Sequence, residues 1–432
     1  MILCACFYIE KTEWFEEQFL YSRHLYNQGR YVINNHYKEH KNFISQTELN
    51  RILRNYEPEF NNYRNLCKAK LSQMILIHLC NNYKSYFKSV KDYKVNPSKY
   101  KGEPRLPKYK DTLNPLYFDY QSVKIRDGFI VITKDVKVHI PTNVYRDEFK
   151  SFKTVNFIPK GRKIKVVISY ETAEIRSDLD ADKYLSIDFG MNNLCACISE
   201  DGCFLINGRP LKSINQIYNK KNSELKAKRP KIVKKYQDKR VNRVKLESLS
   251  LNRDLRINSY LHNCTTYIIN FCIEHKIVTI VLGRNKNWKD SISLSKTVNQ
   301  NFVGIPFYRM LNMLAYKCKR LGINFVLQEE SYTSKCDALA FESIEKHENY
   351  KGSRIKRGLF KSSVGKLINA DINGALNILR KFLNSTKGTS EFSVLQKIIG
   401  SGLVFRPVRI TGNGIEAKLC SIHGYNRTNE FY

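Results

Sequence analysis

The chain has 432 residues, 42% of them hydrophobic, which is long enough for two or three domains with buried cores. Lys and Arg number 73 against 40 Asp and Glu, a formal net charge of +33. Self-repulsion of this size favours a polyanionic partner, and no apolar run approaches the roughly 20 residues that span a bilayer. The composition therefore indicates a nucleic-acid-binding protein and argues against a membrane protein.

The first ten residues are apolar but lack the charged start of a signal peptide, so they are expected to form an edge strand. From residue 11 to 95, apolar and aromatic residues recur at three- and four-residue steps, which predicts helices. Basic and aromatic residues interleave over residues 83–94, a pattern typical of either a solvated helix face or a nucleic-acid-binding face. Gly102 and Pro107 then break the helical region.

Short runs of alternating polarity follow, separated by Asp127-Gly128 and Lys160-Gly161 turns. We expect strands at residues 117–120, 123–126, 129–132, 136–140 and 164–168. This region is predicted to form a small antiparallel β-domain.

From residue 181 strands alternate with helices, the pattern of an α/β domain whose sheet is covered by helices. We expect strands at residues 184–188, 195–199, 277–282 and 324–328, and a last helix near residues 373–382. A long and strongly basic helical stretch is expected between the second and third of these strands.

The strand from Tyr184 to Asp188 ends in a carboxylate, and Gly190 allows the chain to turn sharply behind it. A carboxylate presented in this way at a sheet edge is suited to bind a metal ion. Asp at a strand end also forms turns, so the pattern alone leaves a purely structural role open.

A second carboxylate, Asp371, opens the predicted last helix. Its apolar face is formed by Ala375, Leu376, Ile378 and Leu379. Asn373 and Asn377 are four residues apart on one face and are candidates for lining a polar site. The alternative interpretation is that Asp371 only caps the helix, as Asp often does.

Further segments occur in a fixed order between these carboxylates. They are Leu282-Gly-Arg-Asn-Lys-Asn-Trp288-Lys, Asn299-Gln-Asn-Phe-Val-Gly-Ile-Pro306-Phe, Gln328-Glu-Glu-Ser-Tyr-Thr-Ser-Lys-Cys336 and Lys356-Arg-Gly-Leu-Phe. With the Asp188 and Asp371 motifs, they resemble the TnpB/OrfB family of transposon-encoded nucleases, whose relatives include miniature type V CRISPR effectors and the Fanzor proteins. The resemblance covers residues 184–382, and KGEPRLPKY is the best matching segment of the N-terminal half.

The resemblance implies a multidomain α+β and α/β fold. A RuvC nuclease domain of the RNase H-like class would be preceded by a β-barrel-like wedge domain with an inserted helical recognition region. The implied boundaries are 1–10 for the first wedge strand, 11–110 for the recognition region, 111–180 for the wedge domain and 181–390 for the nuclease domain, which would carry a basic helical insert at 211–260 and a loop at 337–360. The tail, residues 391–432, is unassigned.

The implied activity is that of a transposon-encoded, RNA-guided DNA endonuclease, a metal-dependent phosphodiester hydrolase. Its partners would be a guide RNA and double-stranded target DNA with a short adjacent motif, with a monomer favoured and no membrane involved. The implied location is the prokaryotic cytoplasm and nucleoid, or the nucleus if the host is a eukaryote. Catalysis would use two Mg²⁺ ions, for which Mn²⁺ is expected to substitute.

The resemblance also implies three carboxylates as metal ligands and catalytic groups. Asp188 and Asp371 match the first and third. The family normally carries the second as a Glu at the position of Gly283, whereas some members supply it just before a Thr-Ser pair. The spacing to this pair favours Glu330 for the role, with Glu329 as the alternative. Only one of the two can point into the site, because strand alternation directs them to opposite faces.

Most family members also carry two CxxC pairs between the second and third carboxylates. This chain has no CxxC pair, and Cys336 is accompanied only by His347, so no structural zinc site is predicted. Phosphate contacts are predicted for the basic insert and loop. The residues are Lys226, Lys228, Arg229, Lys231, Lys234, Lys235, Lys239, Arg240, Arg243, Lys356 and Arg357.

Two other functions compete with the nuclease hypothesis. A nuclease-dead, RNA-guided DNA-binding repressor is compatible with the missing Glu at Gly283, although the presence of Asp188, Glu330 and Asp371 argues against it. A DDE-type transposase shares the RNase H-like fold, but the basic insert and the Thr-Ser pair argue against that.

Overall fold

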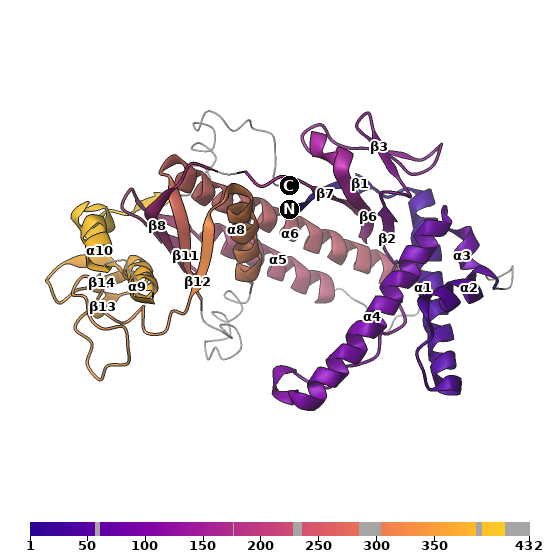
Figure 1. Cartoon of the computed structure of the whole chain (residues 1–432), viewed down its shortest axis with the longest axis horizontal. Helices are drawn as coiled ribbons and strands as arrows, with labels where there is room; N and C mark the ends of the chain where they lie inside the picture. Colours follow the sequence, from indigo (N-terminus) through magenta and orange to yellow (C-terminus); the bar gives the residue numbers. More distant parts are fainter. Residues whose placement is uncertain (57–60, 176, 228–235, 285–303, 386–390, 411–432) are drawn as a thin grey trace. The chain divides into compact units, whose positions relative to one another are not determined.

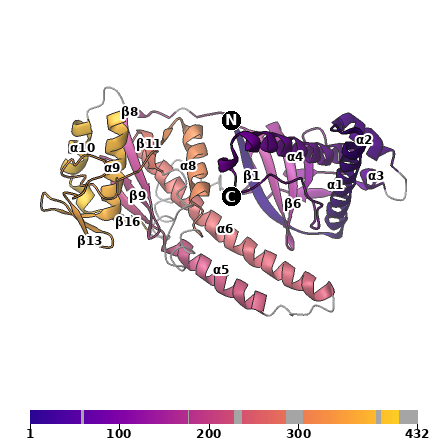
Figure 2. The same cartoon turned by 90° about the horizontal axis from the view of Figure 1, so that it is seen from below.

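The computed structural model describes residues 1–56, 61–175, 177–227, 236–284, 304–385 and 391–410. The chain divides between residues 172 and 173 into two compact units, with the beginning of one later helix, up to Leu251, assigned to the first unit. Each unit is described by itself below (Figures 1 and 2). Among the described residues, no helix is both long and apolar enough to cross a membrane.

The first unit contains a four-stranded antiparallel sheet in the order β1-β7-β6-β2 and a small three-stranded sheet, β3-β4-β5. The strands are β1 (Ile2–Glu10), β2 (Leu116–Asp119), β3 (Lys124–Arg126), β4 (Phe129–Val131), β5 (Lys137–His139), β6 (Phe152–Lys160) and β7 (Lys163–Glu171). In β7, Ile164, Val166 and Ile168 are fully buried at alternate positions, as expected for a sheet with one face in the core.

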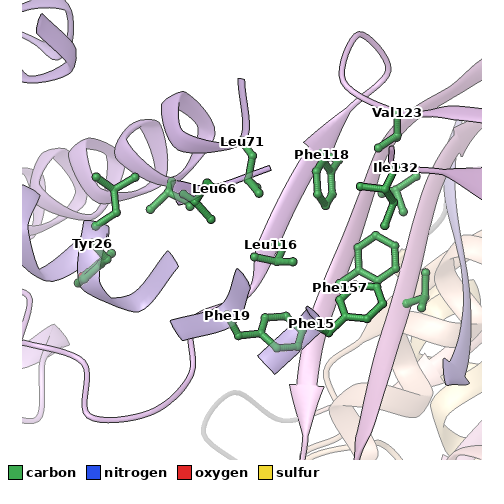
Figure 3. Packing of buried hydrophobic residues seen from close by; sticks show 14 of the residues in the cluster. Phe15, Phe19, Tyr26, Leu66, Leu71, Leu116, Phe118, Val123, Ile132 and Phe157 are labelled. Atoms are coloured by element: carbon green, nitrogen blue, oxygen red, sulfur yellow. The ribbon is translucent and has the colours of Figure 1, made fainter. Parts of the chain in front are cut away.

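Helices share one hydrophobic core with the larger sheet of this unit. They are α1 (Glu13–His40), α2 (Gln46–Arg54), α3 (Asn62–Asn65) and α4 (Ala69–Val95), with short 3-10 turns at Pro97–Lys99 and Asp147–Ser151. Figure 3 shows the contact layer, in which Phe15 and Phe19 of α1 face Phe118 and Phe157 of the sheet. The ring centroids of Phe15 and Phe157 are 5.1 Å apart, so aromatic packing fixes α1 on the sheet.

The second unit is built on a six-stranded sheet in the order β12-β11-β8-β9-β10-β16. The strands are β8 (Asp180–Phe189), β9 (Asn193–Ile198), β10 (Cys203–Asn207), β11 (Ile277–Gly283), β12 (Asn324–Gln328) and β16 (Val408–Ile410). β8, β9 and β10 are antiparallel neighbours, whereas β11 and β12 run parallel to β8.

Helices cover both faces of this sheet. They are α5 (Arg209–Ala227), α6 (Tyr236–Glu274), α8 (Phe307–Leu321), α9 (Ala370–Ser385) and α10 (Glu391–Gly400), with a 3-10 turn at Leu403–Phe405. One core joins the sheet to α6 and α8 through residues such as Ile268 and Met310, and the other joins it to α9 and α10 through Leu376 and Ile398 (Figures 1 and 2). A further small sheet comprises β13 (Ser353–Lys356), β14 (Leu359–Lys361) and β15 (Leu367–Asn369).

Each strand segment expected from the sequence overlaps an observed strand. The strands that were not predicted are β6, β10, β13, β14, β15 and the last strand, β16. Pro159 and Asn156 weaken the strand pattern of β6, and β10 has only five residues, four of them buried without alternation. The expected last helix is α9, which begins three residues earlier than predicted.

Candidate active site

The parallel strands of the second unit end at one edge of the sheet. Ile187 of β8 pairs with Leu282 of β11, and Gly283 of β11 pairs with Gln328 of β12. Asp188 is therefore placed at the same edge as the end of β12, because parallel strands finish together there. Glu330 follows β12 by two residues, which brings a second carboxylate to this edge.

Two glycines let these carboxylates lie directly against the backbone. A Cβ atom at Gly283 would be 2.7 Å from Oε2 of Glu330 and would also collide with Ile378. A Cβ atom at Gly374 of α9 would be 2.7 Å from Oδ2 of Asp188. The carboxylate of Glu330 therefore occupies space that a side chain at position 283 would need.

Like charges surround Asp188. Removal from water raises the pKa of the Asp188 carboxyl well above its ordinary value, and the neighbouring charges of Glu330 and Asp371 raise it further. Arg354 opposes this shift. A carboxylate in such surroundings is stabilised in its charged form by a cation.

Asp371 lies in the first turn of α9 but does not cap the helix. Oδ1 of Asn369 accepts the backbone N–H groups of Asp371, at 2.9 Å, and of Ile372, at 3.4 Å. The carboxylate of Asp371 instead accepts a 2.7 Å hydrogen bond from Nδ2 of Asn193, and its Oδ1 lies 3.7 Å from Nη2 of Arg354. Because Asn369 performs the capping, the carboxylate of Asp371 is directed into the site.

Glu329 has different surroundings from Glu330. Its Oε1 accepts the backbone N–H of Ser331 at 2.7 Å, and its Oε2 pairs with the ammonium of Lys381. Burial raises the pKa of Glu329, but the hydrogen bonds from Lys381 and Ser331 outweigh it and leave the pKa below the ordinary value. Both glutamates lie beyond β12, which ends at Gln328, so alternation along a strand does not apply to them. The turn after β12 gives the two side chains their different surroundings.

The three carboxylates, Asp188, Glu330 and Asp371, are the candidate ligands of a divalent cation. In the part of the chain that the structure describes, no three His, Cys, Asp or Glu side chains form a group that would hold a single ion. The charges of Glu330 and Asp371 both act on Asp188, so a cation bound near Asp188 would offset the repulsion from both. All three offer hard oxygen donors, which fit Mg²⁺ better than a thiophilic metal.

Sequence comparisons match two segments of this unit. Residues 167–289 match the family model OrfB_IS605, described as "Probable transposase", and residues 307–378 match the Cas12f1-like TNB domain. These two segments are therefore similar to the TnpB/OrfB family and to the TNB domain of Cas12f1-like proteins.

A curated relative supports the same assignment. The TnpB-like protein ORF457 of Acidianus two-tailed virus is 25% identical over 255 residues, which is 56% of this chain. The match spans 49% of that relative, so the chain covers about half the length of the curated protein it resembles.

A solved structure shows the fold. The protein in the cryo-EM structure of the Cas12f1-sgRNA-target DNA complex has a TM-score of 0.51 and 15% identity, and the alignment covers 85% of this chain and 82% of that one. CRISPR-Cas_phi3, a mini-RNA-guided endonuclease, aligns with a TM-score of 0.44 at 10% identity over 90% of this chain and 94% of that one. The alignment with the Cas12f1 protein shows that the chain has a mixed α/β multidomain fold of that kind.

The TNB-like region is held together by a buried group that we call the polar knot, formed by Asp337, Glu342, Asn373, Asn377 and Arg380. Oδ1 of Asp337 accepts the backbone N–H groups of residues 339 and 340, and Oδ2 accepts from residues 362 and 363. Glu342 accepts the backbone N–H groups of residues 337 and 351, each at 2.7 Å. Two buried carboxylates thus tie together three separate segments of the chain, at residues 337–342, 351 and 362–363.

The amides of α9 complete the knot. Asn373 and Asn377 each donate to the carbonyl oxygen of Cys336, and Asn377 also donates to that of Thr333. Arg380 donates to the carbonyl oxygen of Glu342 and to Oδ1 of Asn377. The two asparagines, candidates for lining a polar site, are fully buried and hydrogen-bonded to the loop that follows Glu330.

Cys336 and His347 do not fit a tetrahedral zinc site. The thiol of Cys336 is buried and donates to the carbonyl oxygen of Glu345, whereas His347 is hydrogen-bonded to Ser343. Only one thiol is available in this region, and hydrogen bonds already fix the loop.

The basic residues predicted to bind nucleic acid are only partly within the described chain. Lys226, on α5, and Lys356 and Arg357, beside the small sheet β13-β14-β15, are exposed. Lys239, Arg240 and Arg243 belong to α6, and their side chains are not described. Lys228, Arg229, Lys231, Lys234 and Lys235 lie outside the described residues, as do residues 285–303 of the family motifs.

Positive charge also gathers beside the site. Burial lowers the pKa of Lys212, and the charges of Arg357 and Arg209 lower it further. Lys212 donates to the side chain of Asn192, next to the Asn193 that contacts Asp371. An anionic ligand approaching the carboxylates would meet these cations.

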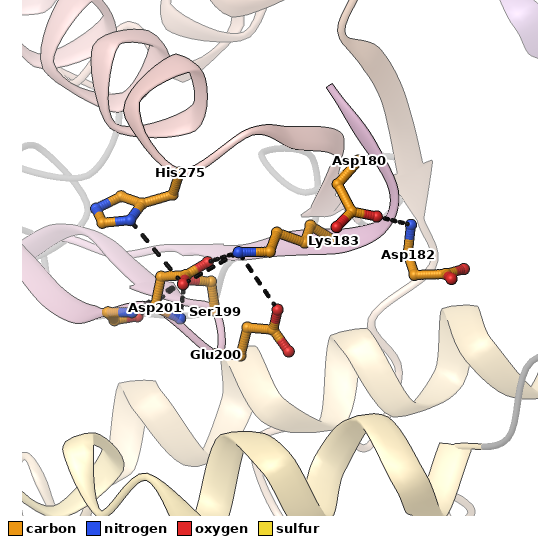
Figure 4. A network of polar contacts seen from close by, with 8 residues as sticks. Asp180, Asp182, Lys183, Ser199, Glu200, Asp201 and His275 are labelled. Carbon is orange, nitrogen blue, oxygen red and sulfur yellow. Dashed lines mark hydrogen bonds and ion pairs between the residues drawn. The ribbon is translucent and has the colours of Figure 1, made fainter. Parts of the chain in front are cut away.

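Acidic residues also gather at the opposite end of β8, where that strand begins (Figure 4). There Nζ of Lys183 lies 3.0 Å from Asp201 and 3.6 Å from Glu200, and Nδ1 of His275 lies 4.0 Å from Asp201. The ammonium of Lys183 thus pairs with both Glu200 and Asp201. These acids therefore differ from Asp188, whose neighbours are mainly other carboxylates.

The sequence did not single out Asn193 or Arg354 as partners of Asp371. Asn193 was visible as the last residue of the Asp188 turn motif, which closes the hairpin between β8 and β9. Arg354 belongs to the basic loop predicted at residues 337–360, but the sequence did not indicate that it contacts Asp371.

Proposed function

We propose that the chain is an RNA-guided DNA endonuclease of the TnpB type whose RuvC-like site comprises Asp188, Glu330 and Asp371. The observation that carries the proposal is that Glu330 lies beside Gly283, the position where the family usually has an acid. The position that lacks the usual acid is a glycine, and the carboxylate of Glu330 fills the space beside it. When the second acid comes from the segment after β12, the site needs no acid at position 283, where β11 ends.

Asp188, Glu330 and Asp371 would hold two Mg²⁺ ions, which would supply activation of a water and charge stabilisation at the scissile phosphate. Asn193 orients the carboxylate of Asp371 through its amide N–H. Arg354, in the metal-free arrangement, supplies the positive charge nearest to Asp371 and is placed to contact a phosphate once cations occupy the carboxylates.

The Cas12f1 protein, which the chain resembles, is described in complex with a single guide RNA and target DNA. We extend both partners to this chain, since a formal net charge of +33 requires a polyanion and the exposed Lys226, Lys356 and Arg357 suit phosphate contacts. The double-stranded target would carry a short adjacent motif, and guide pairing would select its sequence.

The proposal is tested with the RNA that copurifies with the protein. That RNA is sequenced, and a plasmid carrying the matching target beside a randomised flank is incubated with the complex and Mg²⁺. We expect linearised plasmid from the parent protein and none from Asp188→Asn or Asp371→Asn, because each removes a charge that holds an ion.

Both variants should retain the RNA and bind the target. Binding without any cleavage by the parent protein would instead identify a repressor. Absence of copurifying RNA, together with DNA-strand joining, would identify a transposase.

A further inference from the structure

A segment of irregular chain lies along α1 and is fixed there by three side chains of one helix face. Nδ2 of Asn27 donates to the carbonyl oxygen of Lys110 at 2.9 Å, and Oδ1 of Asn27 accepts the backbone N–H of Lys110 at 2.8 Å. Nε of Arg30 donates to the carbonyl oxygen of Pro107 at 2.5 Å, and Arg23 donates to that of Asp111 at 3.4 Å. Residues 107–111 therefore form a strap held in one position against the helix.

The strap, α1 and Asn62 of α3 border a shallow, open pocket of about 340 Å³, lined by His24, Asn27, Gln28, Tyr31, Asn62 and Tyr109. This is at the small end of the range of roughly 300–1,000 Å³ found for ligand pockets. The walls contain no carboxylate. They consist of two aromatic rings, three amides and one imidazole.

The two tyrosines are unusually open for large aromatic residues. Tyr31 is 54% exposed and Tyr109 is 52% exposed. The guanidinium of Arg30 lies 3.8 Å from the ring centroid of Tyr109, so a cation covers one side of that ring while half of the residue stays in solvent. A flat ligand can extend this stack without any rearrangement.

The polar lining is neutral, and part of it is already engaged within the chain, because Asn27 bonds with Lys110 and Asn62 with His24. Amide side chains offer adjacent donors and acceptors. Burial lowers the pKa of His24, as does the charge of Arg23, while a hydrogen bond with Asn62 opposes the shift. Cations stand outside this neutral lining, at Arg23, Arg30 and the exposed Lys108.

We propose that this pocket binds an unpaired base of the guide RNA, stacked on Tyr109 and Tyr31, with Arg23 and Lys108 beside the flanking phosphates. The inference rests on the proposed function, which supplies the RNA. A planar, neutral ligand with mixed donors and acceptors and an adjoining negative charge describes a nucleotide. A paired base has no access to a concave pocket, whereas bases of single-stranded RNA are commonly splayed out and stacked on aromatic side chains.

The test uses the full-length chain freed of nucleic acid at high salt. Its affinity is measured for two fluorescent probes, a single-stranded RNA without internal pairing and a blunt RNA duplex. The double variant Tyr31→Ala/Tyr109→Ala should bind the single strand roughly tenfold or more weakly than the parent, since stacking on an aromatic side chain contributes strongly to single-strand binding. Its affinity for the duplex should stay within about twofold, because phosphate contacts dominate there.

Two further variants separate stacking from folding. Tyr109→Trp keeps an aromatic ring and should retain the single-strand affinity. Tyr120→Ala removes a tyrosine that is 60% exposed but does not line the pocket, and should leave both affinities unchanged.

The proposal is overturned if the double variant binds the single strand like the parent, if both probes weaken equally, or if only a single-stranded DNA of the same sequence loses affinity. Should the parent chain bind no RNA at all, the proposed function fails together with the pocket. If instead guided cleavage is observed but the tyrosine variants bind normally, only the pocket fails.

Discussion

Two groups of carboxylates in the second unit have opposite surroundings. In the polar knot, both oxygens of Asp337 and both of Glu342 accept hydrogen bonds from backbone or hydroxyl donors. At the candidate site, Asp188 has two carboxylate neighbours and one opposing arginine. The knot is internally satisfied, whereas the site carries an excess of negative charge that an added cation would offset.

The difference teaches how to separate structural acids from functional ones. A buried carboxylate that accepts several hydrogen bonds already has what its charge needs, so its removal should cost stability. A carboxylate beside others of the same charge destabilises the empty protein and is retained for what it binds. The two groups should therefore respond oppositely to neutralising substitutions.

The largest stability effect is expected in the knot. Asp337→Asn replaces one acceptor oxygen with an NH₂ group that faces the hydroxyl and backbone donors of Ser362 and Ser363. We expect a loss of roughly 2–4 kcal/mol in the free energy of unfolding, because buried donors lose their partners. Urea denaturation measures this loss.

Asp201→Asn is the matched control, since it removes an acid that is paired with Lys183 at the surface. Its cost should stay below about 1 kcal/mol. Equal losses from the two substitutions would contradict the view that the knot is a special structural element.

The next effect concerns activity and the space beside Glu330. Gly283→Ala should lower the cleavage rate by about 100-fold, the order of loss that a displacement of about 1 Å causes in a catalytic group. Gly400→Ala is the control, because a methyl group there meets nothing within 4 Å. Full activity of Gly283→Ala would show that the carboxylate of Glu330 is not needed where the structure places it.

A smaller effect of opposite sign is expected for Asp188→Asn in protein free of divalent ions. The substitution removes the least favourable charge and should stabilise the chain by roughly 1 kcal/mol, as is common where function opposes stability. Because the pKa of Asp188 is raised in the folded state, the parent protein should lose stability as pH rises above about 4, the ordinary pKa of Asp. The variant should lack this part of the pH dependence, which thermal unfolding across pH would detect.

No effect is expected from removing zinc. Protein purified without chelator should contain well below one zinc per chain, and a strong zinc chelator should leave the unfolding temperature unchanged, because the polar knot fixes the loop that contains Cys336. A stoichiometric zinc content would require ligands beyond Cys336 and His347.

The sequence predicted the parts of this unit whose signals are local. Asp188 was visible at a strand end and Asp371 at a helix start, and the order of the surrounding motifs pointed to Glu330. The polar knot was not visible, because its donors come from turns and from α9, far away along the chain. The same reason hid Arg354, which reaches Asp371 only after the loop has folded.

The role of Asn373 and Asn377 was left open by the sequence for a related reason. Helical spacing correctly placed them on one face of α9, but the sequence does not say which loop covers that face. Asn369 was equally ambiguous, since only the hydrogen bonds reveal that it caps α9 and so frees Asp371. In each case the sequence pattern predicted the helix, whereas contacts with distant parts of the chain determine what the side chain does.

The account depends most on Glu330 completing the site in place of an acid at Gly283. The decisive measurement is Mg²⁺-dependent cleavage of the guide-matched plasmid by Glu330→Gln and by Glu329→Gln, each loaded with the same RNA. Glu330→Gln should be as inactive as Asp188→Asn, whereas Glu329→Gln should cut nearly as fast as the parent, because Glu329 is paired with Lys381 outside the carboxylate group. Normal cleavage by Glu330→Gln, with or without loss in Glu329→Gln, would contradict the account.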